Sequence, residues 1–320
     1  MKNFWKTLKK PIFVLAPMAD VTDVSFRYVI AKYGKPHVMW TEFVSADGLV
    51  RAPEEGKRKL LKDLEYSEIE RPIVAQLFGS NPHNMKKAAQ MVQELGFDGI
   101  DINMGCPDKN IEKQGCGSAM IKNPELAKQI IQAAKEGAPN IPVSVKTRLG
   151  YSTDELEVWL PLLLEANPAL ITLHARTRKE MSKVPARWDR IKRAVQIRDQ
   201  INPEVLIFGN GDVLDTREAQ KKVEETGCDG VMIGRGIFGN PFLFSGRDFV
   251  SIPEKLRALV EHTYLFEQKL GGIKNFAIMK KHFKSYVQDF DHSKELRTSL
   301  MEAENASDVE SVISRFLKKL

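Results

Sequence analysis

Cysteine is scarce in this chain, and no long apolar segment is present. Three cysteines occur among 320 residues, at irregular spacing. A small, odd number of cysteines argues against a disulfide framework and favours a reducing compartment, so we expect a cytoplasmic protein. No apolar run approaches the roughly 18 residues that a membrane span needs. The first ten residues are basic but lack the apolar core of a secretory signal.

Metal-binding patterns are also missing. No pair of cysteines or histidines has the spacing of a zinc site, so we expect no metal. What the chain does contain is 42% hydrophobic and 28% charged residues, which is typical of a globular protein that folds in water. Its net charge of +6 is compatible with a polyanionic partner such as nucleic acid, although charge alone does not establish one. We expect a monomer.

Eight short apolar runs, rich in valine and isoleucine, recur through the first three quarters of the chain. Such uniform apolarity is typical of strands that are buried on both faces, as in a parallel sheet. The runs cover residues 13–18, 38–44, 72–78, 99–104, 142–147, 170–174, 205–209 and 230–234.

Helix signals lie between these runs. Asn81-Pro82 and Asn123-Pro124 each pair a capping side chain with proline at the first helical position. Gly96, Gly137 and Gly227 follow amphipathic stretches and are predicted to end helices.

The number and size of these units predict a closed (β/α)8 TIM barrel over residues 1–249, because about 240 residues accommodate eight strand–helix units in that fold. An open doubly wound sheet is the alternative. That fold more often has a Gly-x-Gly-x-x-Gly turn after its first strand, whereas Ala16-Pro17-Met18-Ala19 stands at this position.

The pattern changes after Phe249. Three stretches with helical periodicity follow, at residues 254–269, 275–288 and 308–317, and no strand candidate lies among them. We therefore expect a small all-helical domain over residues 250–320. The alternative is that these extra helices plug the barrel.

Polar residues and glycines stand at the ends of the predicted strands. In a barrel these ends converge on one mouth, where the chemistry is done. The residues are Pro17 and Met18, Gln76, Asn103 and Cys106, Lys146 and Arg148, His174 and Arg176, Asn210, Gly211 and Asp212, and Gly234 and Arg235.

Two glycine turns, at residues 209–212 and 234–236, follow the last two strands, where this fold commonly binds phosphate. Glycine lets backbone N–H groups approach phosphate oxygens, and Arg235 adds positive charge. Lys146 interrupts an apolar strand. Because a buried unpaired ammonium is costly, it should meet an anion at the mouth, with a structural salt bridge as the alternative. Alternatively, Gln76 is a hydrogen-bonded side chain that fills the barrel interior, and His174 is a neutral histidine of the core.

Together these features suit flavin mononucleotide (FMN). Its phosphate would lie at the glycine turns, Gln76 would bond its pyrimidine edge, and Lys146 would favour the anionic reduced flavin. A sugar-phosphate enzyme without a cofactor remains open. Cys106 adds a thiol at a strand exit, which can act as a nucleophile or a proton donor, or can simply be a small buried hydrophobe at a turn.

Seven motifs then occur in the order in which one family has them. They are APMADVTD at residues 16–23, DINMGCP at 101–107, GCGSA at 115–119, VKTR at 145–148, HARTR at 174–178, GNGD at 209–212 and IGRG at 233–236. With these motifs the chain resembles the bacterial type of tRNA-dihydrouridine synthase over the whole barrel. Residues 279–286 also resemble the basic helix of that family's C-terminal domain.

The resemblance implies a role for each matching residue. Cys106 matches the proton donor, and Asn103 matches a residue beside the flavin and the substrate uracil. The positions that match flavin contacts are Pro17, Met18, Ala19, Gln76, Lys146 and His174, and those that match the phosphate cradle are Asn210, Gly211, Asp212, Gly234 and Arg235. Reduced flavin would deliver hydride from N5 to C6 of uracil, Cys106 would protonate C5, and NADPH or NADH would reduce the flavin.

The resemblance also implies tRNA as the partner. Lys280, Lys281 and Lys284 would hold its phosphates, with Phe276, Met279, Phe283 and Val287 as an apolar stripe against the body of the protein. The barrel arginines Arg148, Arg176 and Arg178 are the other candidates for this contact. Cys116 and the segment Lys183-Val184-Pro185 depart from the family pattern, which affects the choice of target uridine rather than the chemistry.

Two other functions compete with this one. The first is a flavin-dependent barrel oxidoreductase that acts on a free small molecule such as a pyrimidine or dihydroorotate. A basic helical tail has no clear use in such an enzyme. The second is an RNA-binding protein that has lost catalysis, and the presence of both Cys106 and Lys146 argues against it.

Overall fold

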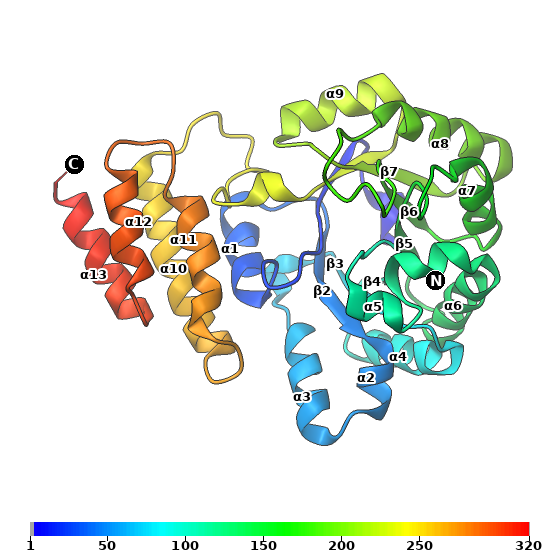
Figure 1. The fold of residues 1–320 in the computed structure, drawn as a ribbon, viewed down its shortest axis with the longest axis horizontal. Coiled ribbons are helices and arrows are strands. Elements are labelled where there is room, and N and C mark those ends of the chain that lie inside the picture. The colour runs from blue at the N-terminus through cyan, green and yellow to red at the C-terminus, as the bar shows by residue number, and fades with distance from the viewer. Residues whose placement is uncertain (1–2, 320) are drawn as a thin grey trace.

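A closed barrel of eight parallel strands forms the larger part of the computed structural model, which describes residues 3–319 (Figure 1). The strands are β1 (Ile12–Leu15), β2 (Met39–Ser45), β3 (Ile73–Phe78), β4 (Gly99–Asn103), β5 (Val143–Arg148), β6 (Leu170–His174), β7 (Leu206–Asn210) and β8 (Gly230–Ile233). From β2 to β8 each strand pairs with the next along the chain, and β1 pairs with β8. A bridge between Val14 and Val38 closes the ring between β1 and β2. The predicted barrel is therefore confirmed, and the open sheet is wrong.

Helices surround the barrel, as the alternation of apolar runs and capping signals predicts. They are α1 (Val24–Gly34), α2 (Ala46–Arg51), α3 (Glu54–Asp63), α4 (Pro82–Glu94), α5 (Lys109–Lys113), α6 (Pro124–Gly137), α7 (Leu156–Glu165), α8 (Trp188–Ile201) and α9 (Thr216–Thr226). The Asn81 and Asn123 side chains accept backbone N–H groups at the starts of α4 and α6, and proline follows each cap.

The three predicted stop glycines have different roles. Gly96 and Gly227 follow α4 and α9 in the left-handed conformation, with φ of +81° and +73°, which glycine adopts without strain. Gly137 instead lies inside the last turn of α6. A Cβ at this position would come within 2.1 Å of the Lys86 carbonyl oxygen, so Gly137 permits close packing of α6 on α4 rather than ending the helix.

The N-terminal end of the barrel is filled by aromatic side chains. Trp5, in the 3-10 turn Phe4–Thr7, packs against Trp40 and edge-on against Phe208, with ring centroids 5.8 and 5.7 Å away. Because this end is plugged by apolar side chains, the opposite end, where the strands finish, is left as the mouth.

The remaining helices form a bundle beside the barrel, and α10 packs on α1 (Figure 1). They are α10 (Ile252–Leu270), α11 (Met279–Tyr286), α12 (Ser293–Met301) and α13 (Ala306–Leu317). The bundle lies outside the barrel, so the idea that these helices plug it is wrong. The ring of Phe26 in α1 stacks on His262 of α10 at 4.9 Å between centroids, which joins the two parts. We propose the domain boundary between residues 249 and 250.

Two details of the bundle differ from the predicted helices. The stretch 275–288 is not one helix, because a short 3-10 turn, Phe276–Ile278, precedes α11 and the helix ends at Tyr286. Helix α12 has no counterpart in the prediction. It begins after His292, which is in the left-handed conformation and makes no side-chain cap, so the usual start signal is missing.

Candidate active site

A cavity of about 580 Å³ opens at the mouth of the barrel, where β1, β5, β6, β7 and β8 end. Its walls contain most of the predicted cofactor residues. They are Pro17, Met18, Lys146, His174, Asn210, Gly211, Asp212, Gly234 and Arg235, joined by Ala16, Arg176, Ser182, Val213, Leu214 and Met232. Ala19 directly follows Met18 but does not line the cavity, and Gln76, Asn103 and Cys106 lie on the neighbouring strands β3 and β4 or just after them.

Lys146 is a buried cation in the wall of this cavity. Its Nζ donates a 3.3 Å hydrogen bond to Oδ1 of Asn210 and forms no ion pair within 4.0 Å with any carboxylate of residues 3–319. Burial, together with the nearby charge of Arg148, lowers the pKa of Lys146 to about 8, although Asp101 opposes this shift. An ammonium destabilised in this way is stabilised by an anionic ligand in the cavity. Among the described residues, Lys146 therefore forms no direct salt bridge within the barrel, contrary to the structural alternative.

His174 is neutral at the cavity wall. Burial and the charges of Arg148 and Lys146 lower its pKa well below 6.5. Its Nε2 lies 3.2 Å from Nη1 of Arg176. Because a guanidinium can only donate, His174 Nε2 accepts and the ring proton is on Nδ1.

The turn after β7 requires glycine. Gly211 has a φ of +126°, and a Cβ there would lie 2.9 Å from Ala186 and 3.2 Å from the ring of His174. After β8, by contrast, a Cβ on Gly234 would meet nothing closer than 3.7 Å, so its backbone faces open space in the cavity. An open, cation-lined backbone turn suits a phosphate group.

Asp212 contacts the residues around this turn. Its carboxylate pairs with Arg176, accepts the Ala186 N–H at 2.9 Å and pairs with Arg235 at 2.9 Å. These arginines outweigh the effect of burial and lower the pKa of Asp212, so the side chain is an anion. It would repel a phosphate, and we therefore assign it the orientation of Arg235 rather than a direct contact.

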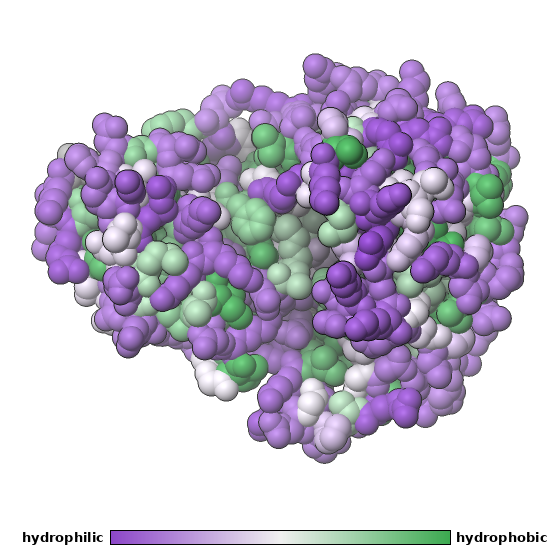
Figure 2. Space-filling model, viewed as in Figure 1, coloured by the Kyte–Doolittle hydropathy of each residue, from purple (hydrophilic) through white to green (hydrophobic). Residues whose placement is uncertain are grey.

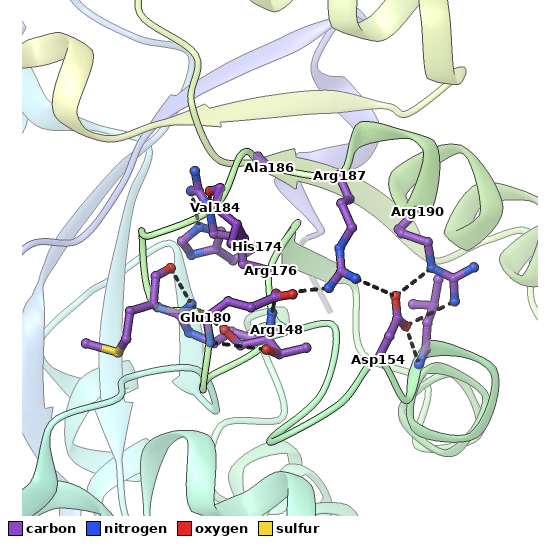
Figure 3. A network of polar contacts seen from close by, with 12 residues as sticks. Arg148, Asp154, His174, Arg176, Glu180, Val184, Ala186, Arg187 and Arg190 are labelled. Carbon is purple, nitrogen blue, oxygen red and sulfur yellow. Dashed lines mark hydrogen bonds and ion pairs between the residues drawn. The ribbon is translucent and has the colours of Figure 1, made fainter.

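Three arginines that were predicted to contact the substrate are bonded inside the protein. Arg148 donates from Nε to the Gly105 carbonyl at 2.7 Å, and Arg176 donates from Nε to the Val184 carbonyl at 2.6 Å. Both are buried. Arg178 forms an ion pair with Glu112. They organise the loop between β6 and α8, in which Arg187 also bridges Glu180 and Asp154 (Figure 3). Contact of these arginines with a substrate stays a prediction.

The backbone of Cys106 is held by hydrogen bonds within its own loop. Oδ1 of Asn103 accepts the backbone N–H groups of Gly105 at 3.1 Å and Cys106 at 2.9 Å. The carbonyl of Cys106 accepts from Ser118, through its N–H at 3.0 Å and its hydroxyl at 2.9 Å. Gly117 is needed beside it, because a Cβ there would lie 2.7 Å from that carbonyl oxygen.

Cys106 is half-buried and free of any disulfide. Burial raises the pKa of its thiol above the ordinary 9.0, although Arg148 and Lys146 act in the opposite direction. The group is therefore a thiol, not a thiolate, at neutral pH. A protonated thiol suits a proton donor better than a nucleophile.

Gln76 occupies a buried polar chain beneath the mouth. Its Oε1 accepts from Asn103 at 3.0 Å, and its Nε2 donates to Asp101 at 2.6 Å. Ser144 donates to the other oxygen of Asp101 at 2.6 Å. Burial raises the pKa of Asp101 to about 6. The chain fixes Asn103 and thereby the cysteine loop, so Gln76 has a structural function whether or not it also meets a cofactor.

The tail lysines lie on α11. Lys281 and Lys284 are exposed and Lys280 is half-buried, while the apolar positions Met279 and Phe283 are buried. Nζ of Lys281 lies 3.8 Å from the Asp20 carboxylate, which stands at the barrel mouth two residues after Met18. The basic helix is thus next to the mouth, and the face is hollowed between bundle and barrel, with hydrophobic residues in the hollow (Figure 2).

Several residues of the site carry no clear signal in the sequence. Ser182 reaches the cavity because the loop after β6 folds back, and Leu214 and Met232 are ordinary apolar positions. Asp101 could have been found, because it is a carboxylate inside an apolar strand, as Lys146 is an ammonium inside one. No cluster of three or more metal-ligand side chains lies within residues 3–319, and no helix there is long and apolar enough to cross a membrane.

Comparison with solved structures places the fold. A 2-naphthoyl-CoA reductase in complex with 2-naphthoyl-CoA aligns with a TM-score of 0.55 and 12% identity over 73% of this chain, which spans about half (49%) of that protein. The 6-hydroxypseudooxynicotine amine oxidase of Pseudomonas geniculata N1 aligns with a TM-score of 0.52 and 12% identity, over 72% of this chain and 46% of its own. At such identity the likeness concerns the fold alone. Fold and mouth together define a (β/α)8 barrel with a cavity lined by cationic and glycine residues at the carboxyl ends of its strands.

Sequence comparison is more specific. The model of the family "Dihydrouridine synthase (Dus)" matches residues 14–320. A "Probable tRNA-dihydrouridine synthase" of Staphylococcus aureus (strain COL) is 40% identical over 98% of this chain and 96% of its own length. A "Probable tRNA-dihydrouridine synthase 2" of Bacillus subtilis (strain 168) is 40% identical over 99% of this chain and 98% of its own. The chain belongs to the dihydrouridine synthase family, whose members are oxidoreductases, and the resemblance seen in the sequence is confirmed.

Proposed function

We propose that this protein reduces the C5=C6 bond of specific uridines in tRNA to 5,6-dihydrouridine, as a cytoplasmic, monomeric, FMN-dependent enzyme with NAD(P)H as the electron donor. The names of relatives that align over nearly the whole chain support the reaction. The observation that carries the proposal is the pairing of two features at one mouth, namely a cation-lined cavity and a protonated thiol on the adjoining loop.

The cavity residues fit FMN. The glycine turns after β7 and β8, with Arg235, would hold the phosphate, and Lys146 would lie against the negative part of the isoalloxazine. The ammonium of Lys146 has a lowered pKa and a hydrogen bond to Asn210, so an anion placed there would offset the free-energy cost of its burial. When bound, a reduced flavin supplies a hydride to C6 of uracil.

Cys106 completes the reaction by delivering its proton to C5. Burial keeps the thiol protonated at neutral pH, and Asn103 fixes the backbone on which it stands. The target base has to leave its stack to reach a barrel mouth, as in other enzymes that modify bases. The basic face of α11 beside Asp20 would hold tRNA phosphates near the mouth.

The experiment has two readings. The purified protein is denatured by heat, and the supernatant is analysed for released FMN. Separately, dihydrouridine is mapped in tRNA from cells with and without the gene. We expect FMN in the supernatant and the loss of dihydrouridine at defined tRNA positions in cells without the gene. A colourless protein that takes up no added FMN, or unchanged dihydrouridine, would refute the proposal. Reduction of free uracil with no activity on tRNA would favour a flavin barrel enzyme for small molecules.

A further inference from the structure

The loop that leads into α11 reaches the barrel through a buried lysine. Nζ of Lys274 donates to Oε2 of Glu42 at 2.8 Å and lies 3.0 Å from Oδ1 of Asp63. The side chains of Lys274 and Glu42 are only 15% and 7% exposed. Glu42 belongs to β2 of the barrel, so this contact joins the helical tail to the sheet itself, across 232 residues of sequence.

Glu42 lies at an irregularity in its strand. The register between β2 and β3 shifts between Trp40 and Phe43, and such bulges re-aim side chains next to active sites. The second oxygen of Glu42, Oε1, accepts the backbone N–H of Asp20 at 2.5 Å. One carboxylate therefore connects Lys274 of the tail with Asp20 of the loop between β1 and α1.

Asp20 belongs to the turn that lines the cofactor cavity. It has a φ of +53°, in the left-handed region, which few residues other than glycine, asparagine and aspartate adopt. In the same turn, the carbonyl of Met18 accepts the N–H of Thr22 at 3.0 Å. The N–H of Met18 donates to the Thr22 hydroxyl at 2.9 Å. Pro17 and Met18 are cavity walls, so the bond from Asp20 to Glu42 fixes the backbone next to the cofactor.

The charge of Lys274 affects how strongly Glu42 accepts the hydrogen bond from the Asp20 N–H. Burial raises the pKa of Glu42, and Lys274 is the main group that opposes this rise. Glu42 and Asp63 in turn raise the pKa of Lys274 despite its burial. Without the ammonium, Glu42 is a buried carboxyl without a counter-ion, which favours its neutral form and weakens its bond to the Asp20 N–H.

We propose that Lys274 is a positioning residue for the reaction: through its ion pair with Glu42 it holds the Pro17–Asp20 turn against the flavin. The tail then has a second function besides RNA binding, because the barrel mouth is incomplete without it. This inference rests on the proposed function, namely that the cavity takes FMN and that the enzyme reduces tRNA.

The test compares Lys274→Met with Lys269→Met in the full-length protein. Lys269 also joins the tail to the barrel, through a 2.9 Å ion pair with Glu65, but it does not touch the Asp20 turn. For Lys274→Met we expect FMN to bind about tenfold more weakly with a shifted visible spectrum. We expect kcat to fall about 10- to 100-fold, because a misplacement of about 1 Å can cost that much. The KM for tRNA should stay within about twofold, since Lys274 is turned away from solvent. Lys269→Met should match the parent in all three.

Two further variants keep the inference falsifiable if Lys274→Met folds poorly. Lys274→Arg retains the charge and should restore most of the flavin affinity. Adding Glu42→Gln to Lys274→Met removes the uncompensated carboxyl, so the double variant should be less impaired than additivity of the two single changes predicts. Flavin affinity and kcat of Lys274→Met equal to those of Lys269→Met would overturn the inference, as would a rise in KM with unchanged kcat. A parent protein that binds no FMN would instead overturn the proposed function.

Discussion

The backbone nitrogen of Cys106 lies 2.9 Å from Oδ1 of Asn103, and this contact links the cysteine loop to the buried polar chain of the barrel. The same Asn103 side chain donates to Gln76, which donates to Asp101. Cys106 therefore stands on a loop whose position is set from inside the sheet. Within the segment Asn-Met-Gly-Cys-Pro, the asparagine therefore fixes the backbone that carries the cysteine.

Changing Asn103 to alanine tests this link without touching the thiol. The backbone N–H groups of Gly105 and Cys106 lose their acceptor, and Gln76 loses its donor, so the loop should move. We expect kcat for tRNA reduction to fall about 10- to 100-fold with the thiol intact. Asn202→Ala, at the end of α8 and distant from the mouth, is the matched control and should keep parental kcat. Equal rates in both variants would mean that Asn103 does not position Cys106.

Lys146→Met should separate stability from function. Removing the buried ammonium raises the free energy of unfolding of the ligand-free protein at pH 7 but lowers FMN affinity by about tenfold or more. The wild-type folded state gives up this proton near pH 8, whereas an unperturbed lysine holds it until 10.5. Since the unfolded chain binds more protons in that window, the wild type gains stability as pH rises through it.

Urea unfolding of both ligand-free proteins measures this effect at pH 7 and at about pH 9.5. The advantage of the variant should be smaller at the higher pH. A variant that is less stable than the parent at pH 7 would show that Lys146 is compensated within the protein and is not held ready for an anion.

Changing Lys280, Lys281 and Lys284 together to glutamate should weaken tRNA binding. Each lost phosphate contact lowers the slope of log affinity against log salt by about 0.7 to 0.9, so the slope should become clearly flatter. FMN content should remain parental, because α11 lies outside the cavity walls. Binding is measured by filter retention of labelled tRNA over a range of salt.

The control for this charge reversal is the same change at Lys86, Lys87 and Lys221. These lysines are exposed on α4 and α9, on the outside of the barrel. Their replacement should alter tRNA affinity much less. If the α11 variant and this control bind tRNA alike, the RNA is held elsewhere on the protein.

Much of the fold was predictable because its signals are local. Each of the eight strands is a short apolar run, and a lysine or a histidine within or at the end of such a run stands out. Glycine turns after β7 and β8 locate the cavity for the same reason. Helix α12 was missed because no capping side chain announces it.

What the sequence did not contain were partners that the fold brings together from afar. In the sequence Arg176 and Arg178 have no neighbouring partner, which favours their interpretation as free cations. Their acceptors are Val184, in the loop after β6, and Glu112, in the helix after β4. Glu42 and Lys274, which are far apart in the sequence, meet where the helical tail packs on the barrel. Pairings of this kind depend on the tertiary arrangement, which no local pattern encodes.

The assignment of Cys106 as the proton donor is tested most directly by single-turnover reduction of tRNA with Cys106→Ala. The pre-reduced, FMN-loaded variant is mixed with unmodified tRNA, and dihydrouridine and flavin oxidation are followed together. We predict normal FMN content and normal reduction by NADPH, with dihydrouridine formation slowed by about 10²- to 10⁴-fold. Cys116→Ala and Cys228→Ala, at the two buried cysteines, should react at close to the parental rate. Formation of dihydrouridine by Cys106→Ala at the parental rate would contradict the account.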